Sequence, residues 1–148
     1  MNPLLSLFAQ LTQDEFAFLE AHGYRLTQTQ TFVDRGVQLV YTTETRFVTI
    51  NYDSLDGSID VDIGSLPMDR AHHASLQELL GLALAASAAE RLPGVVRRVA
   101  SALEENAHLL ETEMPTPDVV RYRTDLTAYY AGKRADRPRN LGPKPKSP

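Results

Sequence analysis

The chain has 148 residues, of which 43% are hydrophobic and 23% are charged, as is usual for a soluble globular protein. It has no cysteine, which excludes disulfides and a cysteine nucleophile and fits a reducing compartment. The longest nearly uncharged run is too short to span a bilayer, and the N-terminus lacks the cationic start of a signal peptide. We therefore expect a cytoplasmic protein with no membrane segment.

Charge is unevenly distributed along the chain. Residues 1–132 contain 9 Lys and Arg against 18 Asp and Glu, whereas residues 133–148 contain 6 against 1. The acidic body disfavours binding to nucleic acid and suits a basic protein partner. The basic, Pro-rich tail cannot bury enough apolar surface to order itself. We predict a single α+β domain over residues 1–132 and a disordered tail over residues 133–148.

The N-terminal residues 3–21 have helical spacing of their apolar side chains. Thr12 and Glu15 have the spacing of a capping box, which predicts that a second helix begins at this point. Gly23 is well placed to end that helix in a left-handed conformation.

Residues 24–32 are predicted to form the first strand, followed by a turn that ends at Gly36. Continued pairing would direct Gln28 and Gln30 toward the core. A bulge at Gly36 or a place at the edge of the sheet would relieve this conflict.

Three further strands are predicted within residues 36–64, because apolar residues there occupy every second position. An Asp-Gly turn at residues 56–57 closes the second hairpin and fixes its register. Both hairpins then select one buried face, on which we expect the pairs Val37 with Tyr52, Leu39 with Ile50, Tyr41 with Val48, Tyr52 with Ile59, Ile50 with Val61, and Val48 with Ile63.

The opposite, outer face of these strands is polar, acidic and partly aromatic. Thr49 is expected opposite Asp62 and Asn51 opposite Asp60, with Phe47 nearby. These five residues form the predicted partner-binding surface: the carboxylates attract a basic partner and the aromatic ring contributes buried contact.

Three helices are predicted after the strands. A capping box at Ser75 and Glu78 begins the first, which runs to about Leu92, and the second covers residues from 95 to before 115. The third begins after the cap Thr116 and ends at Gly132, and its side chains Tyr122, Tyr129 and Tyr130 are expected to pack inward. The predicted fold is α+β, with one or two N-terminal helices, a four-stranded antiparallel meander and three C-terminal helices on one sheet face.

Catalytic motifs are missing from the sequence: it has no nucleophile elbow, metalloprotease helix or Gly-rich phosphate loop. Asp60, Asp62 and His72 are the nearest approach to a metal site, but the plain reading of these aspartates is a solvated strand face. We expect no enzyme activity, no cofactor and no bound metal.

Residues 18–24 (FLEAHGY) followed by residues 48–53 (VTINYD) resemble the layout of small acidic bacterial immunity proteins and their uncharacterised relatives. The resemblance covers about the first 65 residues and implies a non-catalytic protein that binds and blocks a partner. Two alternatives remain open. One is a dimeric chaperone or adaptor that associates through its sheet or its alanine-rich helix, and the other is a small metal-assisted hydrolase at Asp60, Asp62 and His72.

Overall fold

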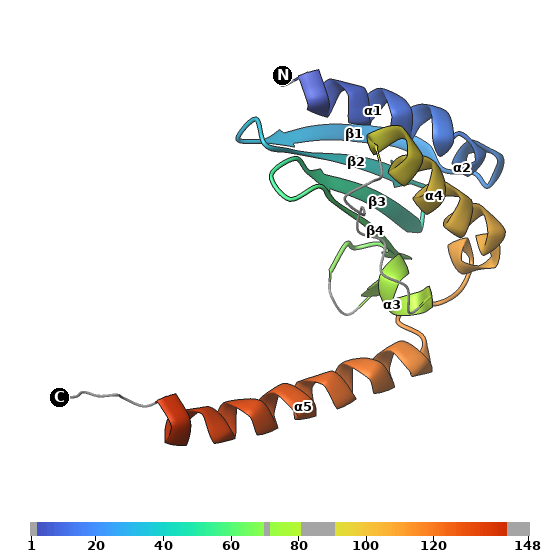
Figure 1. Ribbon diagram of the computed structural model, residues 1–148. Helices are drawn as coiled ribbons and strands as arrows, with labels where there is room; N and C mark the ends of the chain where they lie inside the picture. Colours follow the sequence, from blue (N-terminus) through green and yellow to red (C-terminus); the bar gives the residue numbers. More distant parts are fainter. Residues whose placement is uncertain (1–2, 70–71, 81–90, 142–148) are drawn as a thin grey trace. The chain divides into compact units, whose positions relative to one another are not determined.

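The computed structural model describes residues 3–69, 72–80 and 91–141. The chain divides into two compact units, Met1–Pro115 and Thr116–Pro148, and each is described by itself. The first unit is an α+β structure around an antiparallel sheet of five strands (Figure 1). The second contains one long helix.

The sheet is a meander in which every strand pairs with the next along the chain, in the order β1-β2-β3-β4-β5. Its strands are β1 (Arg25–Phe32), β2 (Gly36–Thr42), β3 (Arg46–Asp53), β4 (Ser58–Ser65) and β5 (His73–Ser75). Four of these were predicted. The fifth lies where a loop was expected, because three residues are too few to show an alternating pattern.

The predicted registers of both hairpins are confirmed. Strands β2 and β3 pair Leu39 with Ile50, and β3 and β4 pair Ile50 with Val61, together with the other expected partners. The shared face is buried throughout: the apolar residues on it are Val37, Leu39, Tyr41, Val48, Ile50, Tyr52, Ile59, Val61 and Ile63.

Helices α1 (Pro3–Glu15) and α4 (Leu92–Glu105) cover this inner face (Figure 1). Phe8 of α1 stacks on Tyr52 of β3, with ring centroids 4.7 Å apart. A 3-10 helix, η2 (Ala107–Leu110), follows α4, and the buried Tyr24 hydroxyl donates to the Leu110 carbonyl at 2.7 Å. The inner face is therefore the core of the first unit.

The predicted second helix start at Thr12 is wrong, because α1 continues through Thr12 to Glu15 and only the short helix α2 (Phe18–Ala21) follows. Thr12 is fully buried, like Leu5 and Phe8 on the same side of the helix. Its hydroxyl has no hydrogen-bond partner in the described part of the chain. Packing of this helix face has overridden the local capping signal.

Strand β1 lies at the edge of the sheet, which is one of the two arrangements expected to relieve the conflict at Gln28 and Gln30. Gln28 and Gln30 nevertheless do not point toward the core: they pair with Val40 and Gln38, on the outer face. The irregularity in pairing falls between Leu26 and Gln28, not at Gly36. Because the pairing begins with Phe32 opposite Gly36 and puts Gln30 opposite Gln38, both glutamines lie on the outer face of the sheet.

The C-terminal helices follow the prediction only in part. Helix α3 (Leu76–Leu80) begins with the predicted capping box, in which Ser75 and Glu78 each accept a bond of 3.0 Å from the other's backbone amide. The remainder of that predicted helix, including most of the alanine-rich stretch, lies outside the described residues. Three C-terminal helices were expected on one face of the sheet, and of these α4 lies on the inner face.

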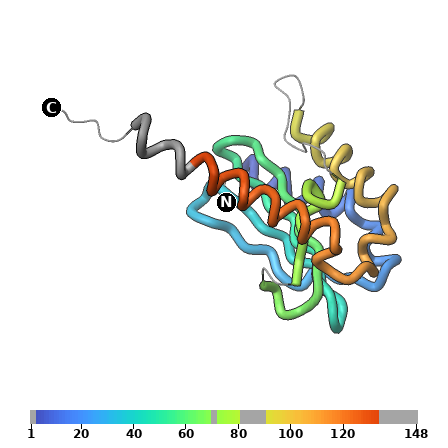
Figure 2. The backbone as a smooth tube through the Cα atoms, turned by 90° about the horizontal axis from the view of Figure 1, so that it is seen from below, coloured from blue at the N-terminus to red at the C-terminus, as the bar shows by residue number. Residues whose placement is uncertain are grey.

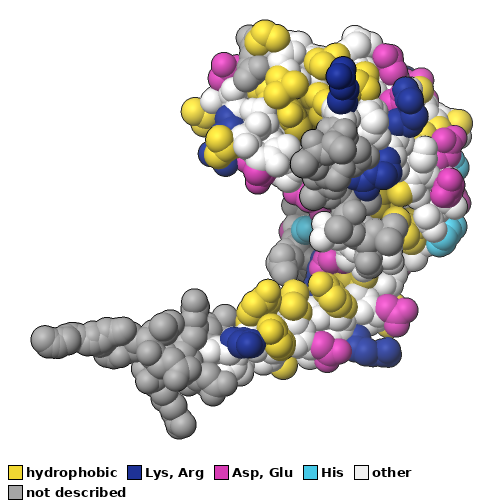
Figure 3. Space-filling view, viewed as in Figure 1, with side chains coloured by type: hydrophobic (Ala, Val, Ile, Leu, Met, Phe, Trp, Pro, Cys, Tyr) yellow, Lys and Arg dark blue, Asp and Glu magenta, His cyan; other side chains and the backbone are white. Residues whose placement is uncertain are grey.

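The second unit contains α5 (Pro117–Leu141), whose first turn is capped as predicted, with the Val119 amide donating to the Thr116 hydroxyl at 3.2 Å. The helix continues past Gly132, where it was expected to end, and that glycine does not adopt the positive φ of a helix terminus. Hydrophobic side chains gather along α5 (Figure 3), and at least 51% of Tyr122, Tyr129 and Tyr130 is exposed. Within the described residues, no helix has the length and apolar character needed to cross a membrane.

Candidate functional site

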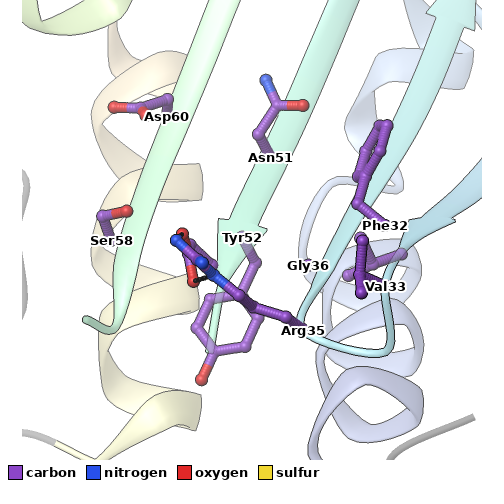
Figure 4. A pocket seen from close by; sticks show the side chains of 10 residues that line it. Phe32, Val33, Arg35, Gly36, Asn51, Tyr52, Ser58 and Asp60 are labelled. Atoms are coloured by element: carbon purple, nitrogen blue, oxygen red, sulfur yellow. Dashed lines mark hydrogen bonds and ion pairs between the residues drawn. The ribbon is translucent and has the colours of Figure 1, made fainter. Parts of the chain in front are cut away.

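Two hollows lie on the outer face of the sheet. The larger, here called the hairpin-end hollow, measures about 540 Å³ and is lined by Phe32, Val33, Arg35, Gly36, Val37, Asn51, Tyr52, Asp53, Ser58 and Asp60 (Figure 4). The smaller, here called the β5-side hollow, measures about 190 Å³ and is lined by Gln38, Phe47, Thr49, Asp62, Met68 and His73.

The hairpin-end hollow forms where two turns of the meander come together. The β1–β2 and β3–β4 turns lie at the same end of the sheet, while the β2–β3 turn lies at the other (Figures 1 and 2). The Arg35 carbonyl accepts hydrogen bonds from both the amide (2.8 Å) and the hydroxyl (2.6 Å) of Ser54. The two turns are thus tied to each other across the sheet.

An ion pair strengthens this connection. The Arg35 guanidinium donates to both carboxylate oxygens of Asp53, at 3.1 and 2.9 Å. The paired guanidinium lowers the pKa of Asp53, and the carboxylate raises the pKa of Arg35. Asp53 also accepts from the Leu55 amide at 2.9 Å. Arg35 therefore holds the two turns at the rim of the hollow together, and Asp53 neutralises its charge.

Gly36 lies at the floor of the hollow and keeps it open, because glycine has no side chain to fill the space. It lies opposite Phe32 on β1 and Asp53 on β3, so its missing side chain leaves space on the outer face. A Cβ atom at this position would stand 3.8 Å from Cδ2 of Phe32 and 3.1 Å from the Tyr52 carbonyl oxygen. Phe32 lines the side of the hollow next to Gly36 (Figure 4).

The rim next to Phe32 is formed by a strained residue. Val33 has a φ of 50° and Asp34 has a φ of 52°. This left-handed conformation is rare for a β-branched residue and costs about 1–2 kcal/mol. The Val33 side chain is 96% exposed, so burial does not offset that cost. Positive φ is usual in hairpin turns, but for a β-branched residue it is an outlier, and strained residues of this kind cluster at functional sites.

The opposite wall is polar and acidic. Asp60 and Ser58 on β4 line it, with Asn51 on β3 between them and Phe32 (Figure 4). The exposed Asp60 carboxylate has no hydrogen bond or ion pair with any described residue. Partial burial raises the pKa of Asp60, and the nearby Asp56 carboxylate raises it further. A positively charged group beside Asp60 would relieve this unfavourable environment.

The five predicted binding residues are divided between the two hollows. Asn51 and Asp60 line the hairpin-end hollow, whereas Phe47, Thr49 and Asp62 line the β5-side hollow. The registers that place Thr49 opposite Asp62 and Asn51 opposite Asp60 are confirmed. Their role in binding stays a prediction.

Accessibility differs strongly among these residues. Phe47 is 2% exposed and packs against the His73 ring, with centroids 6.2 Å apart, and Thr49 is 4% exposed. Burial raises the pKa of Asp62, an effect that a hydrogen bond from Thr49 and the nearby His73 oppose. The hairpin-end hollow is therefore the more accessible part of the predicted surface.

The candidate metal ligands do not come together. His72 engages the Asp69 carboxylate through Nδ1 at 2.5 Å, and it is His73 that lies close to Asp62. Asp60 belongs to the other hollow. Over residues 3–69, 72–80 and 91–141, no three His, Asp or Glu side chains are grouped as metal ligands.

Sequence reasoning missed the aromatic and apolar side of the site. Phe32, Val33 and Gly36 were assigned to an edge strand and its turn, and their contribution to a hollow depends on cross-strand pairing. The signal that could have identified them is the glycine itself, because a glycine inside a strand often marks a close approach of another group.

No family model matches the chain, and no curated protein or solved structure matches it. The resemblance to immunity proteins thus stays a prediction, and the geometry of the outer face carries the functional argument.

Proposed function

We propose that this protein is a non-catalytic binding module of the immunity or inhibitor type, which engages a basic protein partner through the outer face of its sheet. The observation that carries the proposal is the hairpin-end hollow, with an unpaired Asp60 carboxylate on one wall and an exposed aromatic ring on the other. Pockets that combine apolar walls with a few placed polar groups are the usual form of a binding site.

The charge of the first unit supports a basic partner. Residues 1–115 contain 7 Lys and Arg against 16 Asp and Glu. Such a surface accelerates encounter with a basic partner and disfavours acidic ones. Asp60 and Asp62 bring this charge onto the outer face itself, while α1 and α4 occupy the inner face.

The hollow is also suited to binding because its rim is held in place before a partner arrives. The Ser54 bonds and the Arg35–Asp53 ion pair connect its two turns. Little conformational entropy is then lost when a partner docks, which favours affinity.

The test compares two double charge reversals. Asp60→Lys/Asp62→Lys alters the outer face, and Glu104→Lys/Glu105→Lys makes the same change in net charge on exposed residues of α4, which covers the inner face. Each immobilised protein is exposed to a lysate of the source organism at low and high salt, and the retained basic protein is purified and titrated. We expect the outer-face variant to lose affinity and salt dependence, while the α4 variant binds like the wild type. Equal binding by both variants would refute the assignment of this surface.

A second candidate, a dimeric adaptor, is favoured by the edge strand β1. All but one of its eight residues are exposed, and the side of β1 away from β2 has no strand partner among the described residues. Unpaired strand edges are templates for pairing with another chain. Sedimentation of the wild type and of Thr29→Lys/Thr31→Lys tests this candidate: a dimer that the variant disrupts supports it, and a wild-type monomer at all concentrations contradicts it.

A further inference from the structure

We infer that the free edge of β1 pairs with β1 of a second copy of this chain, in an antiparallel ladder with Gln30 on the two-fold axis. The inference rests on the second candidate function, the dimeric adaptor, and deepens it, because it names the occupant of the edge and the residues that meet there. A two-fold dimer requires one surface patch that is complementary to itself. Strand β1 meets this requirement through its regular segment, its sequence and its unobstructed edge.

The part of β1 that can extend the sheet is the segment from Gln28 to Phe32. An irregularity in the pairing with β2 lies just before this segment, between Leu26 and Gln28, and the β1–β2 turn follows it. A ladder that uses the whole segment in both copies is centred on Gln30, because another centre would shorten the ladder or bring the bulge into it. The segment has the usual length of a strand in a globular protein.

The sequence of this segment is complementary to itself in that register. Thr29 lies opposite Thr31 of the second copy, and Thr–Thr pairs of this kind stabilise antiparallel sheets. Gln30 lies opposite Gln30 of the second copy. Its side-chain oxygen accepts from Gln28 Nε2 at 3.3 Å, which leaves a second lone pair and the Gln30 amide N–H groups for a reciprocal bond across the axis. Gln28 meets Phe32 of the second copy, and its aliphatic stem would cover part of a side chain that is 44% exposed.

The charges at the two ends of β1 favour the antiparallel direction. No charged residue occurs in the sequence between Arg25 and Asp34, although natural edge strands commonly carry a lysine or another charge that prevents such pairing. In the antiparallel ladder, Arg25 of one copy comes near the turn of the other copy, which carries Asp34. A parallel ladder would instead place each of these charges beside its own counterpart, and like charges directly opposite are destabilising. The remaining cation of the turn, Arg35, is paired with Asp53.

The helices of the inner face leave room for a second copy beside β1. Thr29 and Thr31 pair with Leu39 and Val37, so their side chains lie on the inner side of the sheet, yet both are exposed. The helices that bury Leu39 and Val37 therefore stop short of β1. Because the two-fold axis is perpendicular to the sheet, the joined sheet would present both outer faces, with their hollows, on one side.

The first experiment reads the register with single cysteines in the full-length chain, which has no cysteine of its own. Gln30→Cys would face its own copy with Cα atoms about 4.5–5.5 Å apart, within the range of a disulfide. Thr29→Cys and Thr31→Cys would face each other, whereas each is about 7–8 Å from its own copy. Under a mild oxidant we expect Gln30→Cys to form a covalent dimer alone, and the other two variants to do so only when mixed. The matched control is Ser101→Cys, at an exposed position of α4, which should stay monomeric on a non-reducing gel.

The second experiment is sedimentation over a range of concentrations. We expect the wild type to reach twice the mass of the chain, Gln30→Lys to weaken dimerisation roughly tenfold by placing like charges opposite each other, and Ser101→Lys to behave like the wild type. A wild-type monomer at all concentrations would overturn both this inference and the adaptor candidate. A dimer in which Thr29→Cys cross-links alone as readily as in the mixture, or Ser101→Cys cross-links as readily as Gln30→Cys, would overturn only the ladder centred on Gln30. Neither result depends on Asp60 or Asp62, so the outer-face proposal is tested separately.

Discussion

Gly64 permits the sharpest prediction about how the outer face is built. It lies on β4 between Phe47 of β3 and His73 of β5, and its missing side chain lets those two rings approach to 6.2 Å. A Cβ atom at Gly64 would overlap the carbonyl oxygen of His72 and stand 2.7 Å from the His73 Cβ. Real Cβ atoms do not tolerate such contacts, so Gly64→Ala must displace β5.

The magnitude follows from two opposed terms. Forcing one extra methyl group into packed surroundings costs about 1–3 kcal/mol. Replacing a glycine also restricts the unfolded chain, which stabilises by about 0.4–1 kcal/mol where the native conformation is compatible. The groups in conflict at Gly64 are mainly backbone, which cannot rotate away. We expect a net loss of about 1–2 kcal/mol in the free energy of unfolding.

The assay is equilibrium urea unfolding, with Gly94→Ala as the matched control. Gly94 lies in the first turn of α4, and a Cβ atom there would meet nothing within 4 Å. That variant should gain about 0.5 kcal/mol from its higher helix propensity. The urea midpoints should therefore move in opposite directions. A Gly64→Ala protein as stable as the wild type would refute the close packing of β5 against β4.

Three other substitutions test further details. Thr12→Val should stabilise the protein by about 1 kcal/mol, because it removes a buried hydroxyl that has no partner in the described residues. Val33→Gly should stabilise the protein by about 1 kcal/mol by relieving the left-handed φ. Asp62→Asn should stabilise the protein more at pH 7 than at about pH 3.5, below the ordinary aspartate pKa.

The sign of the pH effect follows from linkage. Burial raises the pKa of Asp62, so the folded state holds this proton more tightly and stability falls as the pH rises through the folded pKa. Asp53 behaves in the opposite way. Its pKa is lowered by the bond with Arg35, so the stability that the ionised carboxylate contributes is lost as the pH falls through the folded pKa. Urea midpoints of the three variants and the wild type, measured at the two pH values, check these signs. An Asp62→Asn advantage that is independent of pH, a Val33→Gly loss of stability or an unstable Thr12→Val would each contradict its structural premise.

The sheet register was predictable from the sequence because two independent hairpins select the same buried face. A shift of one residue in either would have turned Ile50 and its neighbours to the polar side. Such agreement between local pattern and global packing is what makes a register unique. Where only one local signal existed, as at Thr12, tertiary packing decided otherwise.

The candidate site was predictable only in its polar half. Alternation placed Asn51 and Asp60 on the outer face, but it could not show that Phe47 on the same face is buried. Accessibility depends on what neighbouring strands and loops place beside each residue, as His73 does for Phe47. The aromatic wall was missed for the same reason, since Phe32 meets Gly36 only through pairing of β1 with β2.

Two features of residues 33–36 shape the hollow. Gly36, the first residue of β2, leaves the outer face open beside Phe32, and a Cβ atom there would stand 3.1 Å from the Tyr52 carbonyl oxygen. Val33 at positive φ costs about 1–2 kcal/mol, which glycine at this position would avoid. Both features open or border the same hollow, and neither contributes to the core on the inner face. Local rules broken together at one place, in a sheet otherwise consistent with its sequence, favour binding as the reason for the shape of the hollow.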